Sequence, residues 1–243
     1  MKVPVFINSF NRLTWLREMV DELQRFEGVE SINVVDNDSS YPPLVWYLEH
    51  LSKREAKEGE LPIYTCMLEQ NNGPRSAYDV AKVYAKNQGL AYVCVVDPDL
   101  DLRGLPSDFI LRCVAALASH KDVNKVGASL RIDDIPENAV LRDEILSYEE
   151  VYWKIKRDED WYEADIDTTF LVERTETGFS YGPALRSAKF SARHLPWYIT
   201  RETLTAEDVF YFRNLDKVHK PGIYWSTLFS DGRLERQNSL QEN

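Results

Sequence analysis

Residues 90–101, LAYVCVVDPDLD, decide the fold that the sequence predicts. The run 92–96 is apolar and β-branched without polar alternation, which is typical of a strand buried on both faces of a parallel sheet. Pro98 cannot donate a hydrogen bond to a neighbouring strand, so the strand should end there. Asp97 and Asp99 are therefore expected at the carboxyl end of a central strand, where open α/β sheets bind their ligands.

The Asp-x-Asp sequence at this position is a candidate metal site. Carboxylate oxygens suit hard cations such as Mg²⁺ or Mn²⁺, and these ions commonly link a protein carboxylate to a substrate phosphate. The alternative is an acidic turn that only ends a strand. Asp-x-Asp alone does not decide between the two.

Length and charge limit the possible classes of function. The 243 residues fit one large α/β domain, with or without a small appendage. The 29 basic and 40 acidic residues give a formal net charge of −11, which argues against nonspecific binding to nucleic acid or to anionic membranes. An anionic substrate would then need local cations or a metal ion.

The cysteines and the hydropathy pattern indicate the compartment. The sequence has three cysteines and no CxxC pair, which predicts thiols in a reducing environment. The apolar run at the N-terminus is too short for a signal peptide, and no window approaches about 18 apolar residues. We therefore expect a cytoplasmic protein without an integral membrane segment.

Strands and helices alternate along the first hundred residues. Apolar runs at 3–7, 31–35, 61–68 and 92–96 are each joined to the next by a segment with apolar residues at helical spacing. This alternation predicts βαβ units and a parallel sheet with helices against it. Right-handed crossovers would place the polar clusters that follow these strands on one edge of the sheet.

Two later segments carry further candidate residues. If 161–174 is extended, Glu163, Asp165 and Asp167 lie on one face of the strand. Like charges there would raise each other's pKa, and a carboxylate with a raised pKa is a better proton acceptor near neutral pH. The alternative is a solvated acidic loop. The segment 186–198 is basic and aromatic, and it could supply cations for a diphosphate. Those candidate cations are Arg186, Lys189, Arg193 and His194.

An aromatic helical face is expected between these segments and the Asp-x-Asp strand. It consists of Tyr148, Val151, Tyr152 and Ile155. Packing in the core is the commoner explanation of such a stripe. A further helix is expected at the C-terminal end, with Thr205 as its N-cap.

Four short motifs together resemble the family 2 type of GT-A fold glycosyltransferases. They are VPVFINSFNR at 3–12, VVDNDS at 34–39, QNNGPRSA at 70–77 and VVDPD at 95–99. The resemblance implies a GT-A domain over 1–243, an α/β fold with a mostly parallel central sheet flanked by helices. Within it, 1–102 would be the half that binds the nucleotide sugar, 103–200 the acceptor and catalytic half, and 201–243 a C-terminal appendage.

The resemblance also assigns roles to residues of the donor site. Asn8, Ser9 and Arg12 would line the base and ribose pocket, and Asp36 would hydrogen-bond the base. Asn72 and Arg75 would lie near the ribose or the diphosphate, with Arg193 as a further cation. Asp97 and Asp99 would hold the ribose and a Mn²⁺ or Mg²⁺ ion, with Asp99 as the metal ligand. A later histidine often completes such a site, and His194 is the candidate.

The implied reaction moves a sugar from a nucleotide-diphosphate sugar to an acceptor hydroxyl, with inversion. Its base would be Asp167, or Asp165 as the second choice. Glu207 and Asp208 are the other candidates, but they follow the histidine and so depart from the family's order. The partners would be the donor and a glycan or another hydroxyl acceptor.

Three other functions remain open at this point. One is a nucleotidyltransferase of similar fold, although its glycine-rich N-terminal loop is missing here. Phosphohydrolases of the haloacid-dehalogenase kind also begin with an apolar strand and Asp-x-Asp, but they carry this motif near the N-terminus, whereas three strands precede it here. A non-catalytic module that binds nucleotide sugars would show binding without turnover. The sequence specifies neither the base and sugar of the donor nor the oligomeric state.

Overall fold

The computed structural model describes residues 1–139, 141–167, 169–176 and 183–215. Its strands are β1 (Val3–Ser9), β2 (Val29–Asp36), β3 (Ile63–Met67), β4 (Tyr92–Val96), β5 (Leu100–Asp101), β6 (Lys125–Leu130), β7 (Trp161–Glu163), β8 (Phe170–Arg174) and β9 (Ala184–His194). Its α-helices are α1 (Leu13–Leu23), α2 (Pro42–Leu51), α3 (Ser76–Gln88), α4 (Phe109–Ser119), α5 (Arg142–Glu149) and α6 (Ala206–Arg213). The short 3₁₀ helices are η1 (Glu150–Trp153) and η2 (Leu195–Tyr198).

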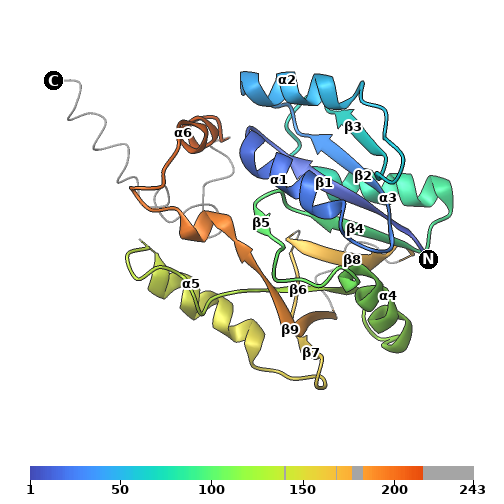
Figure 1. The fold of residues 1–243 in the computed structure, drawn as a ribbon. Helices are drawn as coiled ribbons and strands as arrows, with labels where there is room; N and C mark the ends of the chain where they lie inside the picture. The colour runs from blue at the N-terminus through green and yellow to red at the C-terminus, as the bar shows by residue number, and fades with distance from the viewer. Residues whose placement is uncertain (140, 168, 177–182, 216–243) are drawn as a thin grey trace.

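The strands of the described ranges form one nine-stranded sheet in the order β3-β2-β1-β4-β8-β6-β9-β5, with β7 paired to β9 (Figure 1). β1, β2, β3 and β4 are parallel to one another. β8 is antiparallel to β4 and β6, so β6 and its parallel partner β9 run in the same direction as the first four strands. The predicted α/β fold with a mostly parallel central sheet flanked by helices is confirmed.

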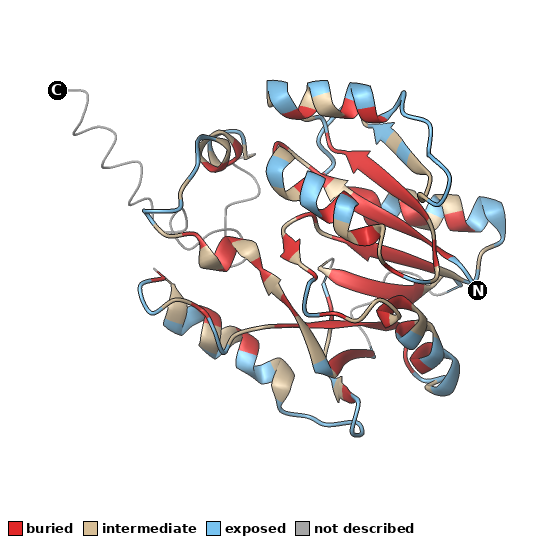
Figure 2. Ribbon diagram, viewed as in Figure 1, coloured by how far each residue is buried: buried red, intermediate tan, exposed pale blue. Residues whose placement is uncertain are grey.

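The central strands β1, β2, β4 and β8 are buried on both faces, as the unbroken apolar strands predict (Figure 2). On one face, alternate residues of β1 and β4 pack with α1, α2 and α4. On the other face, Phe6, Val93 and Val95 pack with α3. These two layers fix the positions of the strand ends on which the candidate site is built.

The stretch 161–174 is not one extended segment, so the condition under which Glu163, Asp165 and Asp167 would share one strand face is not met. β7 pairs with β9, whereas β8 pairs with β4 and β6. Between them Ile166 is buried, and its carbonyl accepts a hydrogen bond from Lys125 at 2.7 Å. Residues 164–167 between the two strands belong to neither of them, so the two-residue alternation that the prediction assumed does not run through the stretch.

β9 carries an irregularity next to β6. Gly127 lies opposite Arg186, and Ser129 lies opposite Ser191, so two residue steps of β6 face five of β9. The additional residues form a bulge, which bends a strand and redirects its side chains. Arg186 precedes the bulge and His194 follows it.

Gly127 allows the backbones of β6 and β8 to approach closely. A Cβ at this position would lie 1.9 Å from the carbonyl oxygen of Phe170. Gly127→Ala is therefore expected to destabilise the fold by about 3 kcal/mol or more, which corresponds to roughly 6–12 °C in Tm. Thermal unfolding followed by circular dichroism measures the change.

Gly59→Ala is the control for this prediction. Gly59 has a φ of +86°, and a Cβ there would meet no atom within 4 Å. Only the backbone strain of a side chain at positive φ remains, about 1 kcal/mol. Equal losses of Tm in the two variants would contradict the steric explanation at Gly127.

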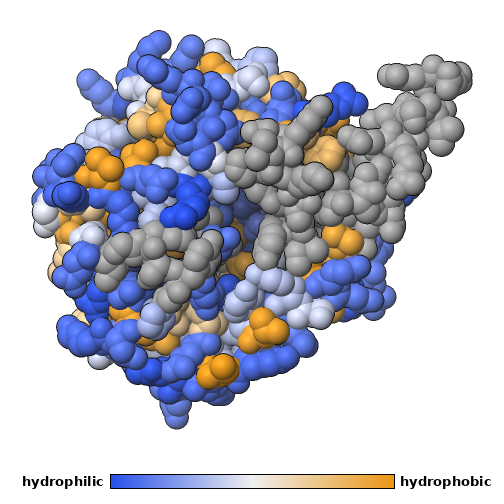
Figure 3. All heavy atoms as spheres, turned by 180° about the vertical axis from the view of Figure 1, so that it is seen from behind, coloured by the Kyte–Doolittle hydropathy of each residue, from blue (hydrophilic) through white to orange (hydrophobic). Residues whose placement is uncertain are grey.

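In the part of the chain that the structure describes, no helix combines the length and the apolar character needed to cross a bilayer. The face in Figure 3 is mainly hydrophilic, with hydrophobic residues scattered among polar ones. Isolated apolar residues of this kind are normal on protein surfaces.

Candidate functional site

A cavity of about 530 Å³ lies at the carboxyl ends of β1, β2, β4, β6 and β9. Residues from the first hundred line one part of it: Asn8, Phe10, Arg12, Asn37, Asn71, Gly73, Pro74, Asp97, Pro98 and Asp99. Later residues line the rest: Leu130, Tyr148, Glu149, Tyr152, Asp165, Asp167, Thr169, Arg186, His194, Trp197, Tyr211 and Leu215.

The topology explains why the cavity is there. From β1 the chain adds β2 and then β3 on one side, and β4 pairs with the other side of β1. The order of strands thus reverses between β1 and β4, and such a switch point leaves a crevice outside the carboxyl ends of the two strands. Asn8 and Arg12 from the β1 end and Asp97 and Asp99 from the β4 end line this crevice.

Two asparagines hold the loops around the crevice. Asn37 donates to Asn71 Oδ1 at 2.7 Å and to the Gly73 carbonyl at 2.9 Å, and it accepts from Asn72 N at 2.8 Å. The Oδ1 atom of Asn11 accepts from the backbone N–H groups of the two residues before α2. The amide can serve as donor and acceptor at once, so it can organise backbone that belongs to neither helix nor sheet.

Asp99 lies between two potential cations. Arg12 Nη1 donates to Asp99 Oδ2 at 3.5 Å, and His194 Nε2 lies 3.7 Å from Asp99 Oδ1. Burial is the main cause that lowers the pKa of His194, although Asp99 opposes the shift, so the imidazole is neutral at pH 7 and keeps a lone pair.

Unpartnered polar atoms gather at the same place. Within the described residues, Asp99 Oδ1, His194 Nδ1, Asn8 Oδ1 and Arg12 Nη2 are buried and lack a hydrogen-bond partner. Buried polar atoms are normally satisfied, by protein, water or ligand. The cluster is therefore suited to a polar ligand.

The residues at Asp99 fit a divalent cation that a substrate helps to hold. No group of three or more His, Cys, Asp or Glu side chains among the described residues is arranged to hold a metal ion by itself. Mg²⁺ and similar ions, however, are often bound by one or two carboxylates together with substrate phosphates. Asp99, with its unpartnered oxygen, neutral His194 and Asp97 in the same wall offer such a partial set.

Arg12 is held between two aromatic rings. Its guanidinium carbon lies 4.0 Å from the ring centroid of Trp15 and 3.8 Å from that of Tyr211, and the residue is 3% exposed. Tyr211 comes from α6, and Glu207 at the start of α6 accepts hydrogen bonds from Thr14 at the start of α1. α6 thus packs against the N-terminal half and fixes one of its side chains (Figure 1).

Of the twelve residues given a donor, metal or base role, the structure brings seven to the cavity and leaves five outside its lining. Those at the cavity are Asn8, Arg12, Asp97, Asp99, Asp165, Asp167 and His194. Those outside its lining are Ser9, Asp36, Asn72, Arg75 and Arg193.

Asp36 and Ser9 lie behind the cavity wall. Asp36 accepts hydrogen bonds from Ser9 Oγ at 3.2 Å, from Ser39 Oγ at 2.6 Å and from Ser39 N at 3.0 Å. Burial raises the pKa of its carboxyl, and these hydrogen bonds oppose the rise. The next residue, Asn37, reaches the cavity in place of Asp36.

In the loop after β3, neighbours of the predicted residues line the cavity. Asn72 is exposed and Arg75 lies near Tyr78, with 5.8 Å between the guanidinium carbon and the ring centroid. Asn71 and Gly73 reach the cavity instead. The hydrogen bonds of this loop to Asn37 determine which of its residues turn inward.

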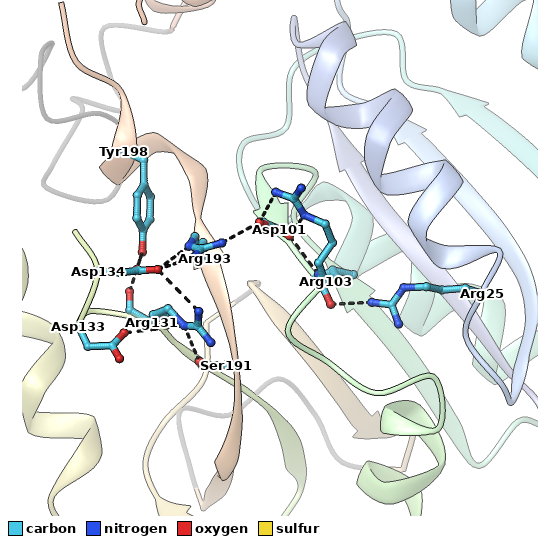
Figure 4. Close-up of polar contacts among 10 residues, drawn as sticks. Arg25, Asp101, Arg103, Arg131, Asp133, Asp134, Ser191, Arg193 and Tyr198 are labelled. Carbon is cyan, nitrogen blue, oxygen red and sulfur yellow. Dashed lines mark hydrogen bonds and ion pairs between the residues drawn. The ribbon is translucent and has the colours of Figure 1, made fainter. Parts of the chain in front are cut away.

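Arg193 points away from the cavity. Its guanidinium contacts Asp134, with Nε at 2.7 Å, and Asp101, with Nη1 at 3.3 Å (Figure 4). Adjacent residues of a strand point to opposite faces, so His194 faces the cavity and Arg193 does not. Lys189 likewise pairs with Asp160 rather than with the site.

The two preferred acidic candidates differ in their surroundings. Asp165 is paired with the buried Lys125, whose Nζ lies 2.9 Å from its Oδ1. Asp167 is exposed and lines the cavity. The other candidates are used for structure, since Thr205 and Asp208 form a capping box at the start of α6, with Thr205 as the predicted N-cap, and Glu207 bonds Thr14.

The sequence analysis missed the role of α5 in the cavity wall. Tyr148 and Tyr152 line the cavity, and Val151 and Ile155 are 48% and 60% exposed, so core packing was the wrong interpretation of this stripe. Glu149 also lines the cavity and is 1% exposed. The sequence held one signal for this role, because Glu149 is a charged residue that directly follows Tyr148 and lies three residues before Tyr152.

Glu149 forms a buried ion pair with Arg186. Burial raises the pKa of Glu149 to about 7, and the Arg186 guanidinium limits the rise. The Nε of Arg186 also donates to the Asp165 carbonyl at 2.6 Å. One guanidinium thus ties α5 to the segment that carries Asp165 and Asp167.

The raised pKa of Glu149 predicts a pH dependence of stability. Its folded pKa of about 7 exceeds the ordinary 4.5, so the folded state binds more protons between these values and its stability falls as pH rises through that window. Glu149→Gln removes the titration. We expect the Tm of the wild type minus that of Glu149→Gln to decrease from pH 4.5 to pH 7.5 in thermal melts; a constant difference would contradict the raised pKa.

Comparison with solved structures identifies the fold. The mannosyltransferase PcManGT from Pyrobaculum calidifontis, in complex with GDP-Man and Mn²⁺, matches 87% of this chain with 14% identity and a TM-score of 0.56, and the chain spans 60% of that enzyme. S. aureus TarS matches 72% of the chain and 28% of its own length at 17% identity and a TM-score of 0.45. A cytidylyltransferase from Leptospira borgpetersenii matches 62% of the chain and 71% of its own at 14% identity and a TM-score of 0.37.

The first of these similarities supports a GT-A-like fold, as the sequence motifs implied. Neither a family model nor a curated protein matches the sequence. The fold is therefore established by structural similarity, and the chemistry has to be argued from the cavity.

Proposed function

We propose that this protein is a glycosyltransferase that moves a sugar from a nucleotide-diphosphate sugar to an acceptor hydroxyl. The observation that carries the proposal is the group formed by Asp97, Asp99, His194 and Arg12 in the cavity at the switch point of a GT-A-like fold. It joins a partial cation site to a buried arginine, as a diphosphate requires.

Each member of this group has a role toward the leaving diphosphate. Asp99, Asp97 and His194 would hold Mn²⁺ or Mg²⁺, which as a Lewis acid would stabilise charge on the departing diphosphate. Arg12 would donate to a phosphate oxygen through its buried, unpartnered Nη2. The rings of Trp15 and Tyr211, 4.0 Å and 3.8 Å from the guanidinium carbon, would keep the guanidinium in place for this contact.

Asp167 is the proposed base. It would accept the proton of the acceptor hydroxyl as that oxygen bonds to the anomeric carbon, while the bond from this carbon to the diphosphate breaks and the diphosphate leaves with the electron pair. Attack from the side opposite the diphosphate gives inversion. Asp165 is less suited because Lys125 already pairs with it.

The first experiment separates binding from turnover. UDP, GDP, CDP and dTDP are tested by thermal shift with and without Mn²⁺, followed by the corresponding sugar nucleotides, GDP-mannose included, in a diphosphate-release assay. We expect one base to stabilise the protein in a Mn²⁺-dependent manner and its sugar nucleotide to be turned over. Binding without turnover on any acceptor would indicate a binding module, and absence of nucleotide binding would overturn the proposal.

Tyr211 should control donor affinity through Arg12. Tyr211→Leu removes one of the two rings that hold the guanidinium. Loss of this cation–π contact should weaken nucleotide binding roughly tenfold. Tyr211→Phe keeps the ring and should keep the affinity. Isothermal titration with the nucleoside diphosphate measures both variants; equal losses would assign the effect to the hydroxyl rather than to the stacked ring.

The cytoplasm is the proposed location. All three cysteines lie in the described ranges and are free thiols, of which Cys94 and Cys113 are buried. Burial raises the pKa of both thiols, so they are poorly reactive. A reducing compartment is compatible with this arrangement.

A further inference from the structure

One side of the cavity is built by α5, η1, the segment between β7 and β8, and the start of β9. We call it the α5 wall; it consists of Tyr148, Glu149, Tyr152, Asp165, Asp167 and Arg186. In the proposed reaction this wall faces the acceptor, because the other side of the cavity carries the groups assigned to the donor. Its chemistry therefore indicates which acceptor fits.

The wall presents two tyrosine rings in a fixed arrangement. Tyr148 and Tyr152 are half-buried, their hydroxyl oxygens are 2.7 Å apart, and their ring centroids are 5.5 Å apart. The guanidinium carbon of Arg186 lies 4.1 Å from the ring centroid of Tyr152 and supports it. A half-exposed ring with a polar edge suits a ligand that has both apolar C–H faces and hydroxyl groups.

The positive charge of the wall is already compensated. Arg186 pairs with Glu149 and also donates to the Asp165 carbonyl. Among the described residues of the α5 wall there are three carboxylates, those of Glu149, Asp165 and Asp167, and one guanidinium, and the Lys125 that pairs with Asp165 is 1% exposed. A phosphate or carboxylate on the acceptor would find repulsion there rather than a partner.

We infer that the acceptor is an uncharged carbohydrate, which lies against Tyr152 with a hydroxyl directed to Asp167. This inference rests on the proposed function and adds the class of its second substrate. It excludes acceptors that bear phosphate or carboxylate next to the reacting hydroxyl. The excess of carboxylates over the single guanidinium in the α5 wall is the feature that sets this selectivity.

Matched sugar pairs test the inference on the full chain with its nucleoside diphosphate and Mn²⁺ bound. The probes are the methyl glycosides of glucose, galactose and mannose, each compared with its uronate counterpart, and binding is measured by saturation-transfer NMR titration. Each pair differs by one carboxylate. We expect at least one neutral glycoside to bind, and to bind about tenfold more tightly than its uronate.

Two variants connect this preference to the wall. Tyr152→Ala should weaken binding of the neutral glycoside about tenfold, and Tyr152→Phe should keep it, because the ring provides the contact. Glu149→Gln removes the carboxylate that pairs with Arg186, and it should raise the affinity for the uronate relative to that for the neutral glycoside. The thermal shift caused by the nucleoside diphosphate with Mn²⁺ shows that each variant is folded.

The outcomes distinguish this inference from the proposed function. If the wild type binds no nucleoside diphosphate, the proposed function fails. The acceptor inference fails, and the donor site stands, if the nucleotide binds normally and one of three results is found. These are a uronate that binds at least as tightly as its neutral counterpart, no binding of any neutral glycoside, or unchanged glycoside binding in Tyr152→Ala.

Discussion

Asp99→Asn is expected to lower sugar transfer at least about a thousandfold and to abolish the Mn²⁺-dependent part of nucleotide binding. Asp99 supplies the unpartnered buried oxygen next to His194, and a bound cation contributes several kcal/mol of charge stabilisation to a reaction of this kind. The measurements are diphosphate release under saturating donor and thermal shift of the nucleoside diphosphate with and without Mn²⁺.

Asp101→Asn is the matched control for this variant. Asp101 lies two residues further along, but its carboxylate pairs with Arg103 and Arg193 outside the cavity lining (Figure 4). Its hydrogen bond from Arg103 is the largest cause that lowers its pKa to about 2. The control should lose some thermal stability and retain the Mn²⁺ effect; loss of the Mn²⁺ effect in Asp101→Asn alone would refute the assignment to Asp99.

Asp167→Asn is expected to reduce kcat by roughly 10²- to 10⁴-fold, because positioned proton acceptors contribute rate factors of this size. Nucleotide affinity should not change, since the residues proposed to hold the donor are other ones. Steady-state kinetics together with titration of the nucleoside diphosphate separates the two quantities. A variant that keeps its full kcat would remove Asp167 as the base.

Asp165→Asn is the comparison for Asp167→Asn. Asp165 pairs with Lys125, which is 1% exposed. Loss of this ion pair should lower the free energy of unfolding by about 1–3 kcal/mol, and a lower Tm would report the change. Its kcat should fall much less than that of Asp167→Asn. The reverse ranking of the two kcat values would make Asp165 the base.

The side of the cavity proposed for the donor was predictable because it is encoded by short local signals. An apolar run that stops at Pro98, and polar residues directly after the other early strands, place Asn8, Arg12, Asp97 and Asp99 at one sheet edge by topology alone. Which neighbour in a loop turns inward was not predictable. Asn37 lines the cavity rather than Asp36 because local hydrogen bonds take up both oxygens of Asp36.

The α5 wall was not predictable, because it depends on contacts distant in sequence. Helical spacing identifies an apolar stripe but does not show whether core or cavity lies opposite it, so Tyr148 and Tyr152 were interpreted as core residues. Glu149 becomes part of the site only where β9 brings Arg186 against it. Likewise, the register of β9 decides that His194 and not Arg193 faces the cavity.

The bulge in β9 sets the reach of the cavity. Arg186 and His194 are on one strand, before and after the extra residues, so the bulge is a spacer between the wall that would hold the acceptor and the group around Asp99. Adding or deleting a residue there would change this span and leave the strands from β1 to β4 untouched. In the proposed reaction, short insertions in this bulge would therefore change which acceptors fit, because they would move Arg186 and the wall around it relative to the group at Asp99.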